Sequence, residues 1–133
     1  MSLKSVIKRQ PVTAPADTRM TRVIELLLAS DSSLVVIVGA DGRMVGLVTE
    51  SSLLVAAFDP LIGNDPVSLH MERQFVSLDL RATVMDAAET FLLHRVRHLP
   101  VLENGKPMGI ISRRDVLRYV MQHPAHGLNA ITL

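Results

Sequence analysis

The sequence predicts an α+β protein made of two β-α-β-β-α repeats. The main observation is an internal repeat, because residues 46–53 (GLVTESSL) return as residues 109–116 (GIISRRDV). Each copy of this phrase is preceded by apolar residues at helical spacing and by a hairpin-type turn dipeptide. Repetition in constant register is the signature of a duplicated supersecondary unit. The fold class therefore follows from one unit that occurs twice.

The first helix of each copy is predicted from the spacing of its apolar residues. One helix is expected over about residues 19–30, and the other begins after Thr83. The apolar positions are Met20, Val23, Ile24, Leu27 and Leu28 in the first copy and Val84, Ala87, Ala88, Phe91 and Leu92 in the second. Met20 and Val84 are 64 residues apart, whereas Gly46 and Gly109 are 63 apart. One residue has therefore been gained or lost between helix and strand.

Strand-forming runs follow each first helix, at residues 34–38 and 98–102. The dipeptides Asp41-Gly42 and Asn104-Gly105 come next, and both tolerate positive φ at two successive positions, which predicts type I′ hairpins. The returning strands, residues 44–48 and 108–111, are continuous and apolar, so both faces of each are expected to be covered. Short strands are also predicted before the first helices, at residues 12–13 and 75–78.

A second helix follows each returning strand. In the later copy its apolar stripe comprises Val116, Leu117, Val120 and Met121, and its basic residues Arg113, Arg114 and Arg118 lie toward the other side. The predicted organisation is a first repeat over residues 5–58, a linker with two prolines and a glycine over 59–71, a second repeat over 72–122 and a C-terminal tail over 123–133. The tail has little periodicity, so it is expected to be frayed or packed on a partner.

The composition is that of a globular protein. Of the 133 residues, 48% are hydrophobic and 20% charged, and the net charge is +1. No apolar stretch approaches the ~18 residues of a membrane span, and the first residues lack the apolar core of a signal peptide, so a cytoplasmic protein is predicted. The sequence has no cysteine, which excludes disulfides and thiolate chemistry and removes the commonest zinc ligand.

The second copy of the repeat carries a hydroxyl and a carboxylate at the start of a helix. Ser112 stands at the expected N-cap and Asp115 three residues later. Free N–H groups at a helix start favour an anion such as phosphate, and a carboxylate can accept hydrogen bonds from the two vicinal hydroxyls of a ribose. Ile110 and Ile111 are placed to flank a planar base. This pattern predicts a nucleotide site.

A capping box is the alternative interpretation of the same residues. Ser-x-x-Asp at a helix start stabilises the helix without any ligand, and the two interpretations can hold together. In the first copy Ser52 stands where Asp115 stands in the second, so that copy lacks the acid.

The order of elements, the doubled Gly-x-x-Thr/Ser-x-x-Asp phrase and Leu99-Pro100-Val101 before Asn104-Gly105 together resemble a tandem cystathionine β-synthase (CBS) domain pair, also called a Bateman module. The resemblance covers about residues 5 to 122. It implies two copies packed about a pseudo-twofold axis and clefts that bind adenosine derivatives such as AMP, ADP, ATP or S-adenosylmethionine. It also implies a flat dimer formed through the helices, to which the stripe of Val116, Val120 and Met121 could contribute.

The resemblance assigns Asp115 to the ribose and Ser112 to phosphate or ribose. The further residues it places around the second-copy site, with the neighbouring arginines, are Ile110, Ile111, Val76, Ser77, Leu78, Arg97, His98, Pro100, Arg113 and Arg114. A weaker first-copy site corresponds to Thr13, Val35, Thr49 and Ser52. That copy departs from the family pattern in having Ser52 for the acid and Ile37 for the proline, so its site is expected to be weak or vacant.

Other functions are less well supported. His94 and His98 are four residues apart, but with no third ligand nearby no metal site is predicted. Five arginines, Arg95, Arg97, Arg113, Arg114 and Arg118, leave nucleic-acid binding open as an alternative, although the near-neutral charge and the few aromatic residues argue against it. No catalytic motif is present, so no enzyme activity and no catalytic cofactor are predicted.

The prediction is a regulatory module that senses an adenine nucleotide or a related adenosyl ligand and signals by rearrangement of a homodimer or of a protein partner. The alternatives are a ligand-free structural interaction module, in which both motifs are only helix caps, and a nucleic-acid-binding protein. No membrane association is expected.

Overall fold

A computed structural model describes residues 3–124, and the described chain packs as two compact units. Unit 1 comprises residues 3–10, 76–103 and 108–124, and unit 2 comprises residues 11–75 and 104–107. The predicted C-terminal tail lies outside the described residues except for residues 123 and 124. Each unit contains a three-stranded sheet and helices, so the predicted α+β class is confirmed.

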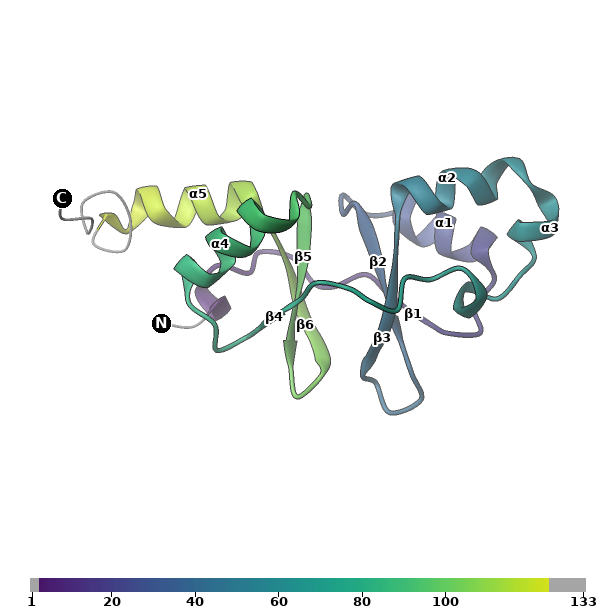
Figure 1. Ribbon diagram of the computed structural model, residues 1–133, viewed down its shortest axis with the longest axis horizontal. Helices are drawn as coiled ribbons and strands as arrows, with labels where there is room; N and C mark the ends of the chain where they lie inside the picture. Colours follow the sequence, from purple (N-terminus) through teal and green to yellow (C-terminus); the bar gives the residue numbers. More distant parts are fainter. Residues whose placement is uncertain (1–2, 125–133) are drawn as a thin grey trace. The chain divides into compact units, whose positions relative to one another are not determined.

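Unit 2 contains the helices and strands of the first repeat. In chain order these are β1 (Thr13–Pro15), α1 (Met20–Leu28), β2 (Leu34–Val38), β3 (Met44–Thr49), α2 (Glu50–Phe58) and α3 (Pro60–Gly63), followed by a 3₁₀ turn at Val67–Leu69. The sheet order is β1-β2-β3, with β1 parallel and β3 antiparallel to β2. Helix α1 packs against α2 (Figure 1). The predicted linker thus contains a short helix, which begins where Asp59 Oδ1 accepts a hydrogen bond from the Leu61 N–H at 3.0 Å.

Unit 1 repeats this order with the second copy. A 3₁₀ turn at Leu3–Ser5 is followed, after unit 2, by β4 (Leu78–Asp79), α4 (Val84–His94), β5 (His98–Glu103), β6 (Lys106–Ser112) and α5 (Arg113–Gln122). The sheet order is β4-β5-β6, and β4 is parallel to β5. Helices α4 and α5 pack together over this sheet (Figure 1). All predicted helices and hairpin strands are therefore present. The short strands β1 and β4 are shifted by one to three residues, β6 begins two residues before its predicted start, and α1 ends two residues before its predicted end.

The two units do not follow the sequence repeats at their edges. The first residues of each repeat pack in the unit that contains the helices of the other repeat. Arg9, from the first repeat, forms an antiparallel bridge with Ile110 in unit 1, and Glu72, from the second, forms the corresponding bridge with Leu47 in unit 2. Each crossing segment lies over a repeated glycine, Gly109 or Gly46, where a Cβ would collide with it. The glycines that begin the repeated phrase are thus explained by this close approach.

Each unit has its own hydrophobic core. In unit 2 the core includes side chains of α1, α2, β2 and β3. In unit 1 it includes Leu3 and Val6, which are almost fully buried with side chains of α4, α5, β5 and β6. The backbone N–H of Leu3 also donates to the carbonyl of Leu80 at 2.9 Å. Residues 3–10 therefore complete the core of unit 1, although the sequence repeat places residues 5–10 in the first copy.

The two hairpins differ. Asn104 and Gly105 have φ of 53° and 79°, as a type I′ turn requires. At the first hairpin only Gly42 has positive φ, 83°, so the predicted type I′ turn at Asp41-Gly42 is wrong. There the N–H of Gly42 donates to Gly39 O at 3.0 Å, and the N–H of Gly39 donates to Arg43 O at 2.8 Å. This is a three-residue loop that ends in a left-handed glycine, and the register shift between Ile37 and Val38 accommodates it.

The predicted apolar stripe of α5 divides in two. Val116 is buried in the core of unit 1 and Val120 packs against it, whereas Leu117 and Met121 are largely exposed. Tyr119, absent from the predicted stripe, is buried instead. Residues 115, 116 and 119 share one face of a helix, since three or four residues make one turn. The buried face of α5 is therefore rotated from the predicted one toward Asp115.

Candidate functional site

Strand β6 ends and helix α5 begins at Ser112, which has the extended backbone of an N-cap residue (φ −115°, ψ 168°). The Ser112 hydroxyl oxygen accepts a hydrogen bond from the Asp115 N–H at 3.1 Å, and Asp115 Oδ2 accepts one from the Ser112 N–H at 2.8 Å. This reciprocal pair is a capping box. The structural interpretation of the motif is thus confirmed, and the geometry leaves one carboxylate oxygen of Asp115 outside the cap.

Asp115 is a buried acid, with only 3% of its surface exposed. Its second oxygen, Oδ1, accepts a hydrogen bond from Arg118 Nη1 at 3.4 Å. A carboxylate removed from water needs partners of this kind, because burying an unpaired charge is costly. The Arg118 side chain is 52% exposed, so the contact joins a buried anion to a cation at the surface.

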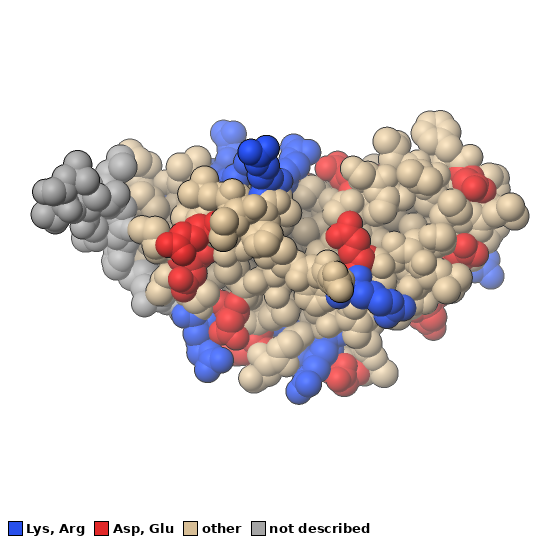
Figure 2. Space-filling model, viewed as in Figure 1, with Lys and Arg blue, Asp and Glu red and all other residues tan. Residues whose placement is uncertain are grey.

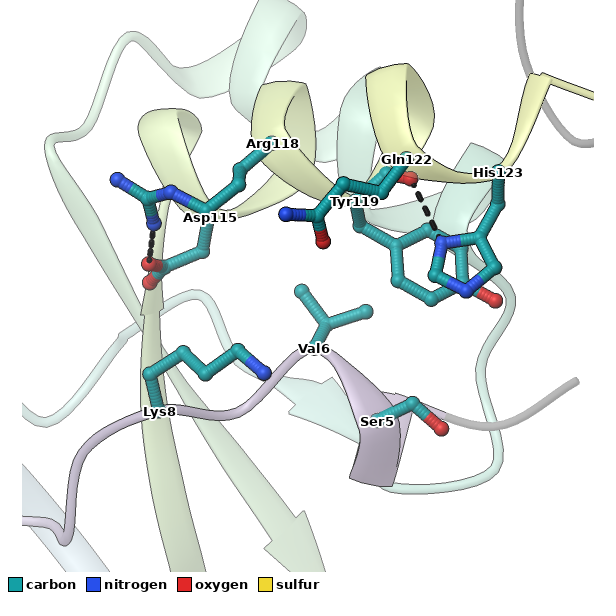
Figure 3. Close-up of a pocket in the computed structure, with 8 residues that line it drawn as sticks. All are labelled: Ser5, Val6, Lys8, Asp115, Arg118, Tyr119, Gln122 and His123. Atoms are coloured by element: carbon teal, nitrogen blue, oxygen red, sulfur yellow. Dashed lines mark hydrogen bonds and ion pairs between the residues drawn. The ribbon is translucent and has the colours of Figure 1, made fainter.

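A small pocket adjoins this pair in unit 1 (Figure 3). Asp115 and Arg118 lie on the α5 wall, and Lys8 lies on the opposite wall in the N-terminal segment. The other lining residues are Ser5, Val6, Tyr119, Gln122 and His123. The imidazole of His123 stacks on the Tyr119 ring with centroids 4.1 Å apart, and both rings close the far end of the pocket. The volume is about 50 Å³, which is room for a few water molecules.

The predicted apolar site residues are in unit 1, but most are buried. Ile110 and Ile111 in β6 are fully inaccessible, and Pro100 in β5 is buried. Leu78 pairs with Val101 in the sheet, whereas Val76 and Ser77 are half-buried just before β4. Among the predicted residues, Asp115 lines the pocket described here. The base-binding role of the apolar residues remains a prediction.

The predicted basic site residues gather at one edge of unit 1. Arg97 precedes β5 and Arg113 and Arg114 follow β6, so the β5–β6 hairpin brings both strand ends to the same edge. All three side chains are exposed, and Figure 2 shows a group of blue side chains over the end of α4 and the start of α5. His98 is half-buried, with Nε2 2.9 Å from Nη1 of Arg9.

The corresponding first-copy residues form a neutral cap. Ser52 Oγ accepts a hydrogen bond from the Thr49 N–H and donates one to the Thr49 carbonyl, both at 3.0 Å. Val35 is fully buried in the core of unit 2, and Thr13 is exposed on β1. The hydroxyl of Ser52 reproduces the cap but brings no charge. A ligand that requires a carboxylate has no equivalent of Asp115 at this position.

Sequence reasoning missed much of the pocket wall. Arg118, Tyr119, Gln122 and His123 follow Asp115 at helical spacing, so a helical projection from Asp115 would have found them. Lys8, Val6 and Ser5 gave no such signal, because they belong to the segment exchanged between the repeats. Their place beside α5 is decided by tertiary packing.

A third capping box, also absent from the predictions, begins α4. The N–H of Thr83 donates to Asp86 Oδ2 at 2.9 Å, and the N–H of Asp86 donates to the Thr83 hydroxyl oxygen at 3.0 Å. The backbone N–H of Thr83, helped by its side chain, lowers the pKa of Asp86 below its ordinary value of 3.8. Unlike Asp115, Asp86 is exposed. It therefore shows the effect of an aspartate that caps a helix without being buried.

Residues 3–124 lack two further classes of feature. No group of three His, Asp or Glu side chains in this range is arranged to hold a metal ion. No helix in the same range is long and apolar enough to cross a membrane.

Comparisons with protein families and with solved structures both point to the CBS domain. The family model described as the CBS domain matches residues 3–59 and again residues 67–122. A solved CBS-domain-containing protein from Agrobacterium tumefaciens is 33% identical, covers 83% of this chain and 84% of its own, and superposes with a TM-score of 0.69. The structure described as CBSX2 in complex with AMP shares the fold at 22% identity, with a TM-score of 0.77 over 91% of this chain and 96% of its own.

Relatives found by sequence are mostly longer proteins. An uncharacterized 17.7 kDa protein of Acidianus ambivalens is 33% identical over 65% of this chain, which spans 52% of that protein. The A-adding tRNA nucleotidyltransferase of Aquifex aeolicus is 28% identical over 65% of this chain, which spans 10% of it. The chain thus corresponds to about half or less of these relatives.

Proposed function

Because the chain belongs to the CBS-domain family and carries two CBS domains in tandem, we propose that it is a regulatory module for an adenine nucleotide or a related adenosyl ligand. In this proposal the ligand binds at the second-copy site around Asp115 and Ser112. Its occupancy is passed on by rearrangement of a dimer or of a protein partner, and no catalysis takes place.

The buried carboxylate of Asp115 is the observation that carries the proposal. One of its oxygens is held by the start of α5, so the side chain is fixed in place. The other oxygen accepts a hydrogen bond from the flexible side chain of Arg118, and both residues line the pocket. An acid presented in this way can accept the hydroxyls of a ribose, and the AMP complex of a protein with the same fold supports this choice of ligand.

Exposed apolar side chains on the helices support a dimer as the means of signalling. On α2 these are Leu54, Val55 and Phe58, and Leu28 ends α1. In unit 1 Leu92 and Leu93 on α4 and Leu117 and Met121 on α5 are also largely exposed. Exposed apolar side chains that share one helix, such as Leu54, Val55 and Phe58, are typical of protein interfaces. A ligand changes such an assembly by as much as its affinity differs between the two arrangements.

Calorimetric titration tests the ligand directly. AMP, ADP, ATP, S-adenosylmethionine and NAD are titrated into the wild-type protein and into Asp115→Ser. We expect at least one adenine nucleotide to bind the wild type and to lose about tenfold or more in affinity for Asp115→Ser, because a charged hydrogen bond is worth at least that factor. The serine variant copies Ser52, so it keeps a cap and loses only the acid.

The control variant is Asp86→Ser. It makes the same chemical change in the capping box of α4, which is exposed and outside the pocket. Nucleotide affinity should stay within twofold of the wild type. If folded wild type binds none of the five ligands, or if Asp115→Ser binds as well as the wild type, the proposed site is wrong.

A ligand-free interaction module is the second candidate, and the complete capping box favours it. Every hydrogen bond of Asp115 described above is made within α5 and its cap, so the acid has a structural role without any ligand. This candidate predicts an oligomer whose mass and melting temperature are the same with and without nucleotides. A nucleotide-dependent shift in either quantity would exclude it.

A further inference from the structure

The contact between Arg118 and Asp115 bears on which ligands the proposed site accepts. Only 1% of the Asp115 side chain is exposed, compared with 52% for Arg118. The hydrogen bond from the Ser112 N–H cannot leave Asp115 without opening the start of α5. The contact from Arg118 Nη1 is longer, at 3.4 Å, and comes from the end of a flexible side chain. Arg118 can therefore leave Asp115 while the helix stays intact. Of these two partners of Asp115, Arg118 is the one that a ligand can replace.

The internal repeat indicates that the arginine belongs with the acid. In the repeat register Asp115 corresponds to Ser52, and Arg118 corresponds to Val55. The first copy thus lacks both charges, and the second has both. A neutral cap needs no counter-ion, whereas a buried carboxylate does. Arg118 is accordingly matched to Asp115 rather than being an arbitrary surface charge.

A ribose and Arg118 compete for the same oxygen. A carboxylate oxygen accepts about two hydrogen bonds, and Arg118 takes one of the two positions on Oδ1. Two vicinal hydroxyls bound at Oδ1 fill both positions, so they displace the guanidinium. Arg118 lines the pocket from α5, and Lys8 lines it from the opposite wall (Figure 3).

We propose that Arg118 makes the second-copy site selective for phosphorylated adenosine ligands, by leaving Asp115 and pairing with the ligand phosphate. This inference rests on the proposed function and names the ligand class of the same site. When the ribose occupies Asp115, the ligand phosphate replaces the carboxylate as the anionic partner of Arg118. A guanidinium binds phosphate in bidentate geometry. Adenosine displaces Arg118 without replacing that partner. S-adenosylmethionine carries a sulfonium charge and no phosphate, so it is also disfavoured.

Calorimetry with AMP and adenosine on wild type and Arg118→Gln tests the proposal. We expect the wild type to bind AMP more tightly than adenosine. In Arg118→Gln the ratio of the two affinities should fall by about tenfold, because AMP loses a charged hydrogen bond and adenosine does not. Arg118→Lys should retain part of the preference, since it keeps the charge without the bidentate geometry.

Arg95→Gln is the control, because it removes an exposed positive charge from the same unit and lies outside the pocket. Its AMP-to-adenosine ratio should equal that of the wild type, and thermal melts should show all variants folded. If AMP binds the wild type but the ratio is unchanged in Arg118→Gln, or falls equally in Arg95→Gln, the role of Arg118 is wrong and the proposed function stands. If folded wild type binds neither adenosine nor any of the five ligands named above, both proposals are wrong.

Discussion

Ser112 and Asp115 hold each other by two hydrogen bonds, each from the backbone N–H of one residue to the side chain of the other. The same carboxylate that starts α5 also forms part of a pocket wall. In the proposed function, stability and ligand binding are therefore coupled at Asp115. Asp115→Ser separates them, because a serine keeps an acceptor for the cap, as Ser52 does, and removes the acid.

Substitution of Asp115 should lower the free energy of unfolding less when the new residue keeps the helix cap. Asp115→Ala removes the acceptor of the Ser112 N–H and the partner of Arg118, and we expect a loss of about 1–2 kcal/mol in the free energy of unfolding. Asp115→Ser restores an acceptor as in Ser52 and should lose roughly half of that or less. Urea denaturation measures both. Equal losses in the two variants would show that the cap contributes little.

Protonation of Asp86 should weaken α4 at acid pH. Its pKa is lowered in the folded protein, so the unfolded state binds more protons in the acid range and stability rises with pH there. The contribution is complete above the ordinary value of 3.8 and is lost as the pH falls through the lower folded pKa. Asp86→Asn should therefore flatten the dependence of the melting temperature between pH 5 and 2. An unchanged slope would contradict this assignment.

The close approach of Ile7 to Gly109 should make this glycine intolerant of a side chain. A Cβ at residue 109 would collide with the branched side chain of Ile7, and overpacking of this kind costs about 1–3 kcal/mol. We expect Gly109→Ala to lower the urea midpoint, and Ile7→Ala to lower it through loss of packing. The double variant should lose less than the sum of the two, because the collision is absent. If the loss in the double variant equals the sum of the two single losses, Ile7 does not contact residue 109.

The exposed apolar face of α2 should carry the proposed dimer contact. Phe58 is 84% exposed and lies one turn from Leu54 on the same helix. Phe58→Ser with Leu54→Ser should convert a dimer into a monomer in analytical ultracentrifugation, with the melting temperature of the monomeric unit nearly unchanged. Exposed Leu69, in the 3₁₀ turn at Val67–Leu69 and outside α2, provides the matched control as Leu69→Ser. A mass that is identical for wild type and the α2 variant would remove α2 from the interface.

Local features of the fold could be predicted with good accuracy. Helix α1 begins at Met20 and β2 spans Leu34–Val38, close to or at the expected bounds, because apolar periodicity and turn residues act over a few residues. The Asn104-Gly105 turn was predicted correctly for the same reason. The Asp41-Gly42 turn was not, since the strand register around Ile37 decides how many residues the loop contains.

The sequence by itself determined that the protein is a duplicated β-α-β-β-α unit and that only the second copy places a carboxylate at the third position of its last helix, where the first copy has Ser52. Both properties depend on local sequence patterns, which can be recognised without a structure. Tertiary structure alone decided that residues 3–10 complete the core of unit 1 and bring Lys8 to the pocket. It also decided which face of α5 is buried. These features depend on contacts between residues far apart in the chain, and such contacts leave no periodic signal in a single sequence.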